Sequence, residues 1–312
     1  MTRFVLKRLV LLPVLLFLFS LTVFAIVHAP PGDFLTTYVA TLASSGSSIS
    51  AEQVEALRRE YGLDQPLPMQ YVRFAANAAR GDFGISIQSR HPVRDLLIQR
   101  LGFTLQLSLA SILVASMIGL VAGIVSATRA YSAFDAASML GALFGISMPI
   151  FWLGLILILV FAVQLHWLPS GGTGTPLHLI LPAIALGSAS AAVIARMTRA
   201  SMLEVVRQDY IRTARATGHR EDVIIFRHAL KNAMIPILTV FGLEFGSMLG
   251  GAVLTETVFS LPGVGRLLVE GIFARDYPVV QGAMMLVATI FVLANLLTDL
   301  AYAFFDPRIR YD

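Results

Sequence analysis

The chain has 312 residues, of which 56% are hydrophobic and only 13% are charged, and its mean hydropathy is +0.76. A soluble domain is about 25% charged, so this composition indicates an integral membrane protein. The net charge of +4 comes mostly from Arg, which in such a protein marks topology and lipid headgroup contact and not nucleic-acid binding. The sequence has no Cys, which excludes disulfides, thiolate metal sites and cysteine nucleophiles.

The first apolar stretch runs from Leu9 to Val27 and follows a basic start. A cleaved signal peptide also starts with basic residues, and the letters "IVHA" before Pro30 resemble a cleavage site. The apolar core of a signal peptide is only about 7–15 residues long, whereas this stretch is long enough to span a bilayer. We therefore expect a retained first transmembrane helix within an N-terminal segment, 1–29.

The segment 30–100 carries two short helical patterns. Ser50 and Gln53 have the spacing of a capping box at the start of the first helix. Pro68 suits the first turn of the second helix, and Gly81 suits its C-terminal end. We expect an extracytoplasmic loop with two helices. The pattern does not distinguish between a lid or packing collar and a surface that contacts another protein.

The remaining segment, 101–312, contains long stretches of apolar residues. They are 101–128, 136–195, 233–258 and 277–298. The stretch 136–195 is too long for one span, and the Pro and Gly residues of 167–178 divide it into a hairpin of two helices. Together with the first helix this gives six spans, so both termini are expected on the same side of the membrane. The predicted fold is an all-α integral membrane protein.

Basic residues in short loops set the orientation of such a bundle. The segments 1–8 and 196–231 are more basic than acidic, whereas the hairpin 165–177 has no formal charge. We therefore expect both termini and the 196–232 loop in the cytoplasm, and the 30–100 loop outside.

Motifs of the common membrane enzymes are missing. Neither Lys7 nor Lys231 follows a Gly, so the sequence has no phosphate-binding loop, and no His-Glu-x-x-His occurs. Ser147 in "GISMP" lacks the second Gly of a nucleophile elbow, and His166 and His178 fit interfacial structural roles. We expect no catalytic residues, no metal site and no ATP hydrolysis by this chain alone. If it pumps, the energy comes from another protein or from an ion gradient.

Four polar residues fall within or at the ends of the last two spans: Glu244, Glu256, Asn295 and Asp299. A carboxylate at membrane depth costs at least about 2.5–3.5 kcal/mol, so each should face a partner or a water-filled path. Asn295 and Asp299 are four residues apart and share a helix face. The residues are candidates for a translocation pathway or gate. The alternative is that they form hydrogen bonds between helices, and for Glu256 that it reaches the membrane interface.

The stretch "DYIRTARATG", 209–218, is a polar element between two spans. Asp209 is a suitable N-cap whose charge complements the helix dipole, and Gly218 can adopt the left-handed conformation that closes the last turn. About two helical turns fit between them. A helix this short has only marginal stability in water, and we therefore expect it to form only when it is docked against something else.

The two faces of this short helix differ. Ile211 and Ala214 lie on one face, and Arg212 and Arg215 mark another. Small residues within it allow another backbone to approach closely. The pattern favours a docking element for a partner protein, although a loop made basic by its cytoplasmic position would also fit.

A series of sequence motifs extends in order along the whole chain. These are "HAPPGDF" (28–34), "YGLDQPLPMQY" (61–71), "GDFG" (81–84), "ISMPIFWLG" (146–154), "ARMTRASMLEVVRQDYIRTARATG" (195–218), "HALKNAMIP" (228–236), "GGAVLTETVFSLPGVGR" (250–266), "RDYPVVQG" (275–282) and "DPRIRY" (306–311). On these motifs the chain resembles the membrane permease subunits of ABC importers for dipeptides and oligopeptides, a family that also includes glutathione, nickel and opine systems. Within the family it is most similar to the first membrane subunit of the dipeptide systems.

The resemblance implies a type I ABC importer permease fold with six transmembrane helices, a cytoplasmic coupling helix at about 209–218 and a helical first outer loop. It also implies a bacterial inner-membrane location and three kinds of protein partner: a homologous second permease, two ATP-binding subunits and an extracytoplasmic substrate-binding protein. ATP and Mg would bind the partner subunits and no cofactor would bind this chain. The expected ATPase-coupling residues are Asp209, Tyr210, Ile211, Arg212, Thr213, Ala214, Arg215, Ala216 and Gly218.

The chain departs from the family pattern in three places. The Glu of the importers' Glu-Ala-Ala signature aligns with Arg212, as is common in the peptide branch. Thr217 stands where that branch usually has Lys, and Phe34 where the outer loop usually has Pro. The expected cargo is a short peptide, with glutathione, an opine or nickel as alternatives. A proton-coupled carrier and a membrane enzyme are the rival classes.

Overall fold

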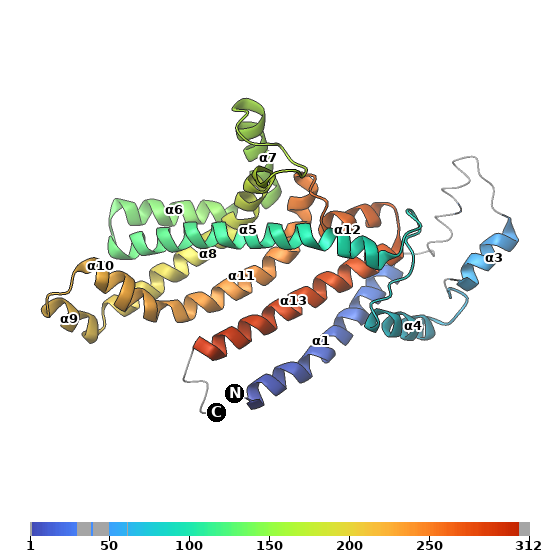
Figure 1. Ribbon diagram of the computed structural model, residues 1–312, viewed down its shortest axis with the longest axis horizontal. Helices are drawn as coiled ribbons and strands as arrows, with labels where there is room; N and C mark the ends of the chain where they lie inside the picture. Colours follow the sequence, from blue (N-terminus) through green and yellow to red (C-terminus); the bar gives the residue numbers. More distant parts are fainter. Residues whose placement is uncertain (1, 30–38, 40–49, 61, 306–312) are drawn as a thin grey trace.

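The structure is a computed structural model that describes residues 2–29, 39, 50–60 and 62–305. In these residues the chain is helical, apart from loops and one bridge between Ile85 and Pro92, which confirms the all-α prediction. Figure 1 shows the helices α1 (Thr2–His28), α3 (Ala51–Glu60), α4 (Leu67–Ala79), α5 (Val93–Thr128), α6 (Ala133–Ser147), α7 (Ile150–Leu157), η1 (Ile158–Gln164), η2 (Pro176–Leu179), α8 (Ile180–Val206), α9 (Asp209–Ala216), α10 (Glu221–Val223), η3 (Ile224–Ala229), α11 (Leu230–Val258), α12 (Val264–Phe273) and α13 (Tyr277–Phe305).

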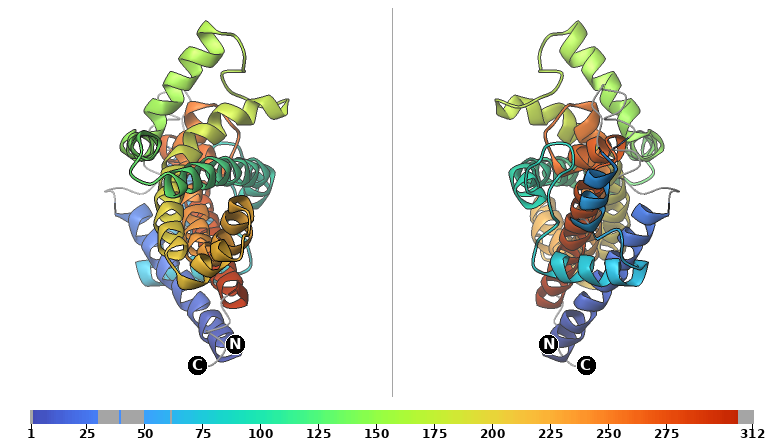
Figure 2. Two further views of the ribbon diagram at one scale, coloured as in Figure 1. Left: turned by 90° about the vertical axis from the view of Figure 1, so that its left-hand side faces the viewer. Right: turned by 90° about the vertical axis from the view of Figure 1, so that its right-hand side faces the viewer.

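Five stretches of helix are long and apolar enough to cross a membrane, and the total reaches the six predicted spans when the bent pair α6 and α7–η1 is counted as one span. The two halves of this pair are bent by 106° relative to each other, a bend that the sequence analysis did not predict. The break falls at Met148 and Pro149, since Pro lacks an N–H and disfavours helical backbone in the residue before it. As a result α7–η1 stands out from the side of the bundle in all the views (Figures 1 and 2).

Helices α5 and α8 pack against each other through small residues. A β-carbon on Gly119 would lie 2.8 Å from the carbonyl oxygen of Ala191, and one on Gly123 would lie 2.7 Å from that of Ala195. Glycines four residues apart let two backbones approach closely, which is a common way to pair helices in a membrane. These two helices therefore form a rigid centre for the bundle.

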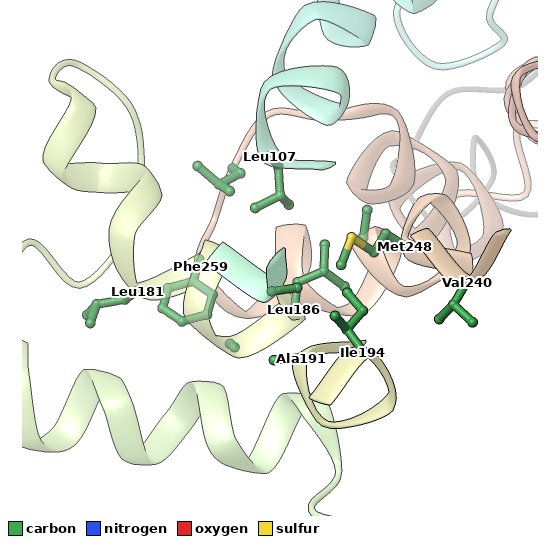
Figure 3. Close-up of a cluster of buried hydrophobic side chains, with 12 residues drawn as sticks. Leu107, Leu181, Leu186, Ala191, Ile194, Val240, Met248 and Phe259 are labelled. Atoms are coloured by element: carbon green, nitrogen blue, oxygen red, sulfur yellow. The ribbon is translucent and has the colours of Figure 1, made fainter. Parts of the chain in front are cut away.

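The buried apolar side chains form three clusters along the long axis. The central cluster joins α5, α8 and α11 through Leu107, Ile194 and Met248, and Phe259 closes it just after α11 (Figure 3). A second cluster lies where α8, α9, η3 and α11 meet, and a third joins the start of α5 to α12 and α13. The two end clusters hold the short helices α9 and α12 onto the bundle.

The short helices occupy opposite ends of the bundle, with α9 and α10 at one end and α3, α4 and α12 toward the other (Figure 1). Helices α1 and α13 pack together, and α1 begins beside the place where α13 ends, both toward the end that carries α9. Helix α5 begins at Val93, so it crosses the domain boundary placed at residue 100. That division into domains stays a prediction.

The predicted helices of the first loop are present where the structure describes it. The capping box is confirmed, because Gln53 N donates to Ser50 Oγ at 3.2 Å and Ser50 N donates to Gln53 Oε1 at 3.0 Å. Gly81, with φ +73°, closes α4 as expected. Tyr71 of α4 lies 3.0 Å from Ser20 of α1, hydroxyl to hydroxyl, so α4 packs against the first span. Most of the motif 28–34 and all of 306–311 lie outside the described residues.

Candidate functional site

Helix α9 ends as the sequence predicts but begins one residue earlier. Gln208, with φ −70° and ψ 150°, is the N-cap, so the prediction of Asp209 in that position is wrong. The chain is still extended at Gln208 and is already helical at Asp209, whose charge therefore lies in the first turn, near the positive end of the dipole. Gly218 has φ +83°, and its N–H donates to the carbonyl of Arg215 at 3.1 Å. The helix thus stops where a left-handed residue is required.

One face of α9 is packed against the rest of this chain. Ile211 is 0% exposed and lies in the cluster with Met202 of α8 and Ile224 of η3. Ala214 packs against the same cluster, as predicted for that face. Tyr210 adds a polar contact, because its hydroxyl accepts a hydrogen bond of 2.8 Å from Asn232. Ile211 therefore fixes the helix to its own bundle and leaves no side-chain surface for a partner.

The other face of α9 is open. Thr213 and Ala216 are exposed, and the side chain of Arg212 is 73% exposed, with its guanidinium 3.6 Å from Asp209. Arg215 is partly exposed and pairs with Glu221 of α10 at 2.7 Å. An exposed ion pair contributes little to stability, so these charges are available to a second protein. The face offers a rigid, small-residue surface with basic side chains.

The carboxylate of Glu256 lies inside the protein, at the end of the bundle opposite α9. Its Oε1 accepts a hydrogen bond of 2.6 Å from Thr104 of α5, and its Oε2 accepts one of 3.0 Å from the backbone of Arg266. Thr104 in turn accepts from the backbone N–H of Val264 at 2.9 Å. Glu256 thus caps the first turn of α12 and ties it to α5 and α11. It is 0% exposed, so the expectation that it reaches the membrane interface is wrong.

The sequence carried a signal for this cap in "LPGVG". A β-carbon on Gly263 would overlap the carboxyl group of Glu256, and one on Gly265 would press on Val253. The two glycines leave room for a side chain that comes from the preceding helix. Sequence analysis did not use them, because a contact partner cannot be read from spacing alone.

The other candidate pathway residues have different neighbours. Glu244 of α11 is half-buried and accepts a hydrogen bond of 2.5 Å from Ser190 of α8. Asn295 of α13 faces Gly246 of α11, where a β-carbon would lie 3.4 Å from its Oδ1. Asp299 belongs to α13, but its side chain is outside the described residues. The described contacts do not bring these residues together with Glu256. They fit hydrogen bonds between helices, and a role in a pathway or gate stays a prediction.

Asp135 forms an ion pair that sequence analysis missed. It is 4% exposed, at the start of α6, and Arg199 of α8 donates to its Oδ1 from Nε and to its Oδ2 from Nη2, each at 2.7 Å. Ser126 of α5 donates to Oδ1, and the backbone N–H of Tyr131 donates to Oδ2 at 2.8 Å. Donors from two helices and one loop therefore meet on a single carboxylate. The charges were visible in the sequence, but their 64-residue separation hid the contact.

A second missed carboxylate, Asp276, holds the last part of the 30–100 loop. It is 2% exposed, and it accepts hydrogen bonds from Ser86 Oγ at 2.6 Å and from the backbone N–H of Gln88 at 3.1 Å. The segment before α5 is thereby fixed to the start of α13. Among the described residues no group of three or more His, Asp or Glu side chains is arranged to hold a metal ion.

The sequence matches the family "Binding-protein-dependent transport system inner membrane component" over residues 119–311 and the N-terminal part of such membrane components over residues 1–109. It is 43% identical over 339 residues to the dipeptide transport system permease protein DppB of Alkalihalophilus pseudofirmus, covering 100% of both chains. It is 45% identical over 311 residues to the glutathione transport system permease protein GsiC of Escherichia coli, again covering 100% of both.

The fold also resembles a solved structure, the inward-facing MetNI methionine ABC transporter. The TM-score is 0.59 at 19% identity, over 68% of this chain and 96% of that one. At this identity the likeness shows the fold alone, which is that of a type I ABC importer permease. Together with the family matches and the six spans, it identifies a multi-pass membrane protein: the chain belongs to the family of binding-protein-dependent transport system inner membrane components.

Proposed function

We propose that this chain is the permease subunit of an ATP-driven importer for short peptides, and that it forms the translocation pathway with a homologous second permease. Two ATP-binding subunits and an extracytoplasmic substrate-binding protein complete the transporter. The family supports the importer class, and the two relatives named above belong by name to a dipeptide and a glutathione transport system. Glutathione, opines and nickel are the alternative cargoes, and uptake assays with each in the presence of the binding protein distinguish them.

The observation that carries this proposal is the construction of α9. Ile211 holds one face on the bundle, Gly218 ends the helix sharply, and Arg212 and Thr213 face outward. A short helix with fixed ends moves as a rigid body, so it can pass a displacement from an ATPase subunit to the spans on either side. ATP binding would close the two ATPase subunits, move α9 and open the permease pair toward the loaded binding protein.

The same arrangement supports the orientation that we propose for the chain in a bacterial inner membrane. The segment 196–232 around α9 is the basic one, so it belongs in the cytoplasm with both termini. The helices α3, α4 and α12 then lie on the outer side, where a binding protein delivers its cargo.

Charge reversal on the open face of α9 tests the proposal. We expect the double variant Arg212→Glu and Arg215→Glu to reduce ATP-driven uptake about tenfold or more, because a docking face that reverses its charges repels its partner. Gly218→Pro should act in the same way, because Pro cannot adopt a positive φ. The amount of chain in the membrane should be unchanged in both.

Arg220→Glu is the control, since Arg220 is 82% exposed, lies just beyond α9 and undergoes the same Arg-to-Glu reversal at a single position. It should leave uptake within about twofold of the wild type, as expected for a surface substitution outside the docked face. Normal uptake by the α9 variants would contradict the docking assignment.

A further inference from the structure

The four-donor cluster on Asp135 lies next to a close contact between α5 and α8. Thr198, the neighbour of Arg199, packs onto Gly123, and Ser126 follows one turn later on α5. Packing between α5 and α8 is therefore already secured without the ion pair. The pair adds something different, a polar contact between α8 and the start of α6.

A buried ion pair is a weak way to gain stability. Removing two charges from water opposes most of their attraction, and an apolar pair of the same size often stabilises as well or better. What the pair does provide is a fixed geometry, because a planar guanidinium binds a carboxylate through two parallel hydrogen bonds. The side chain of Arg199 is 25% exposed and that of Asp135 is 6% exposed, so water screens this pair only partly.

The pair is connected to α9 through adjacent side chains. Met202 lies one helical turn after Arg199 on α8 and is 0% exposed. It belongs to the same apolar cluster as Ile211, the residue that fixes α9. A displacement of α9 would therefore act on the part of α8 that holds Arg199.

On its other side, the pair is connected to the broken helix. Asp135 lies in the first turn of α6, and α6 runs without interruption to the break at Met148 and Pro149. Beyond this 106° bend, α7–η1 stands out from the bundle (Figure 2). A rotation or shift of α6 at Asp135 would therefore change the position of α7–η1.

From this continuity we propose that the Asp135–Arg199 pair is the joint through which movement of α9 reaches the broken helix α6–α7. The two residues are positioning residues for the coupling of ATP hydrolysis to transport, and they contact neither ATP nor cargo. The inference rests on the proposed function and adds to it a specific route inside this chain.

The test uses the complete transporter in proteoliposomes, with its ATPase subunits and binding protein. The variants are Asp135→Asn, Arg199→Gln and the double variant, which leaves no unpaired charge in the cluster. The control is the double variant Arg220→Gln and Asp222→Asn, which removes an exposed ion pair of 3.0 Å at the same end of the bundle. The readouts are the amount of assembled complex, basal ATPase activity, its stimulation by loaded binding protein, and uptake per ATP hydrolysed.

We expect the double variant at Asp135 and Arg199 to assemble and to keep basal ATPase activity within about twofold of the wild type. Stimulation by the binding protein and uptake per ATP should fall by roughly tenfold, within the range typical of coupling between two sites. Each single variant should be equally uncoupled and less well assembled, because it leaves a buried charge unpaired. The control should match the wild type.

Two results would overturn the inference. Wild-type stimulation and uptake in the double variant would show that the pair transmits nothing. Proportional loss of complex, basal activity and uptake in all three variants would show that the pair serves only folding. Neither result affects the proposed function, which fails instead if the wild-type chain transports without its ATPase subunits.

Discussion

Glu256 illustrates how a membrane protein accommodates a fully buried carboxylate. Both of its oxygens accept hydrogen bonds, one from Thr104 and one from the first turn of α12. The positive end of a helix dipole favours a negative charge at that position. The two glycines of "PGVG" provide the space. The residue therefore links three helices at the end of the bundle opposite α9.

The substitution Gly263→Ala tests this arrangement. The new β-carbon would overlap the Glu256 carboxyl group, so α12 or Glu256 must shift, and overpacking of this kind costs about 1–3 kcal/mol. We expect a lower midpoint of thermal unfolding in detergent. Gly250→Ala is the control, because no atom lies within 4 Å of its β-carbon position. Equal midpoints for both variants would contradict the cap assigned to Glu256.

At the scale of elements, α9 depends on contacts that a helix of two turns cannot supply by itself. Ile211 is its fully buried side chain, and the remaining contacts are polar or peripheral. An isolated helix of this length is marginal in water. The exposed face of α9 is consequently held in place by a residue on the opposite side of the same helix.

The substitution Ile211→Ala should loosen α9 without changing its exposed face. Truncation of a buried Ile side chain to Ala costs about 2–5 kcal/mol, and here we expect it to lower the free energy of local unfolding of α9. We expect tryptic cleavage after Arg212 and Arg215 to become roughly tenfold faster or more. Thr213→Ala is the matched control, since the Thr213 hydroxyl donates only within the helix, to the carbonyl of Asp209. Unchanged cleavage in the Ile211 variant would show that this anchor is dispensable.

At the scale of the whole molecule, the two ends of the bundle differ, because a different group of short helices lies at each end. The chain has no Cys, so single-Cys variants can be labelled without background. We expect Gln65→Cys, next to α4, to react with a membrane-impermeant maleimide in cells whose inner membrane is intact. Thr213→Cys on α9 should react only after the membrane is opened. The reverse pattern would contradict the orientation, and labelling of both from one side would contradict the topology.

Much of this architecture could be predicted because its signals are local. Uncharged stretches mark the spans, Ser50 with Gln53 marks a helix start, and Gly218 marks a helix end. The N-cap of α9 was misplaced by one residue because Gln208 and Asp209 compete for it, and only the backbone angles decide. Pro149 could be seen in the sequence, but the 106° angle of the bend there could not, because it depends on the packing around the helix.

The part of the candidate site that could not be predicted consists of contacts between residues that lie far apart in the sequence. Asp135 meets Arg199, and Glu256 meets Thr104, which is 152 residues away. The positions of charged residues in the sequence do not show which residues of two helices lie opposite each other. Neither contact could therefore be distinguished from the other possible pairings. The sequence identified Glu244 and Glu256 as carboxylates that need a partner in the membrane, but it did not identify Asp135 and named no partner for any of them.

The most direct test of the central claim is uptake by purified components in proteoliposomes. This chain, its partner permease and two ATPase subunits are reconstituted with a binding protein loaded with a labelled dipeptide. The account predicts uptake that requires ATP, survives collapse of the proton gradient and is lost with the Arg212→Glu and Arg215→Glu double variant. Uptake by this chain alone, driven by a proton gradient and indifferent to ATP, would contradict it.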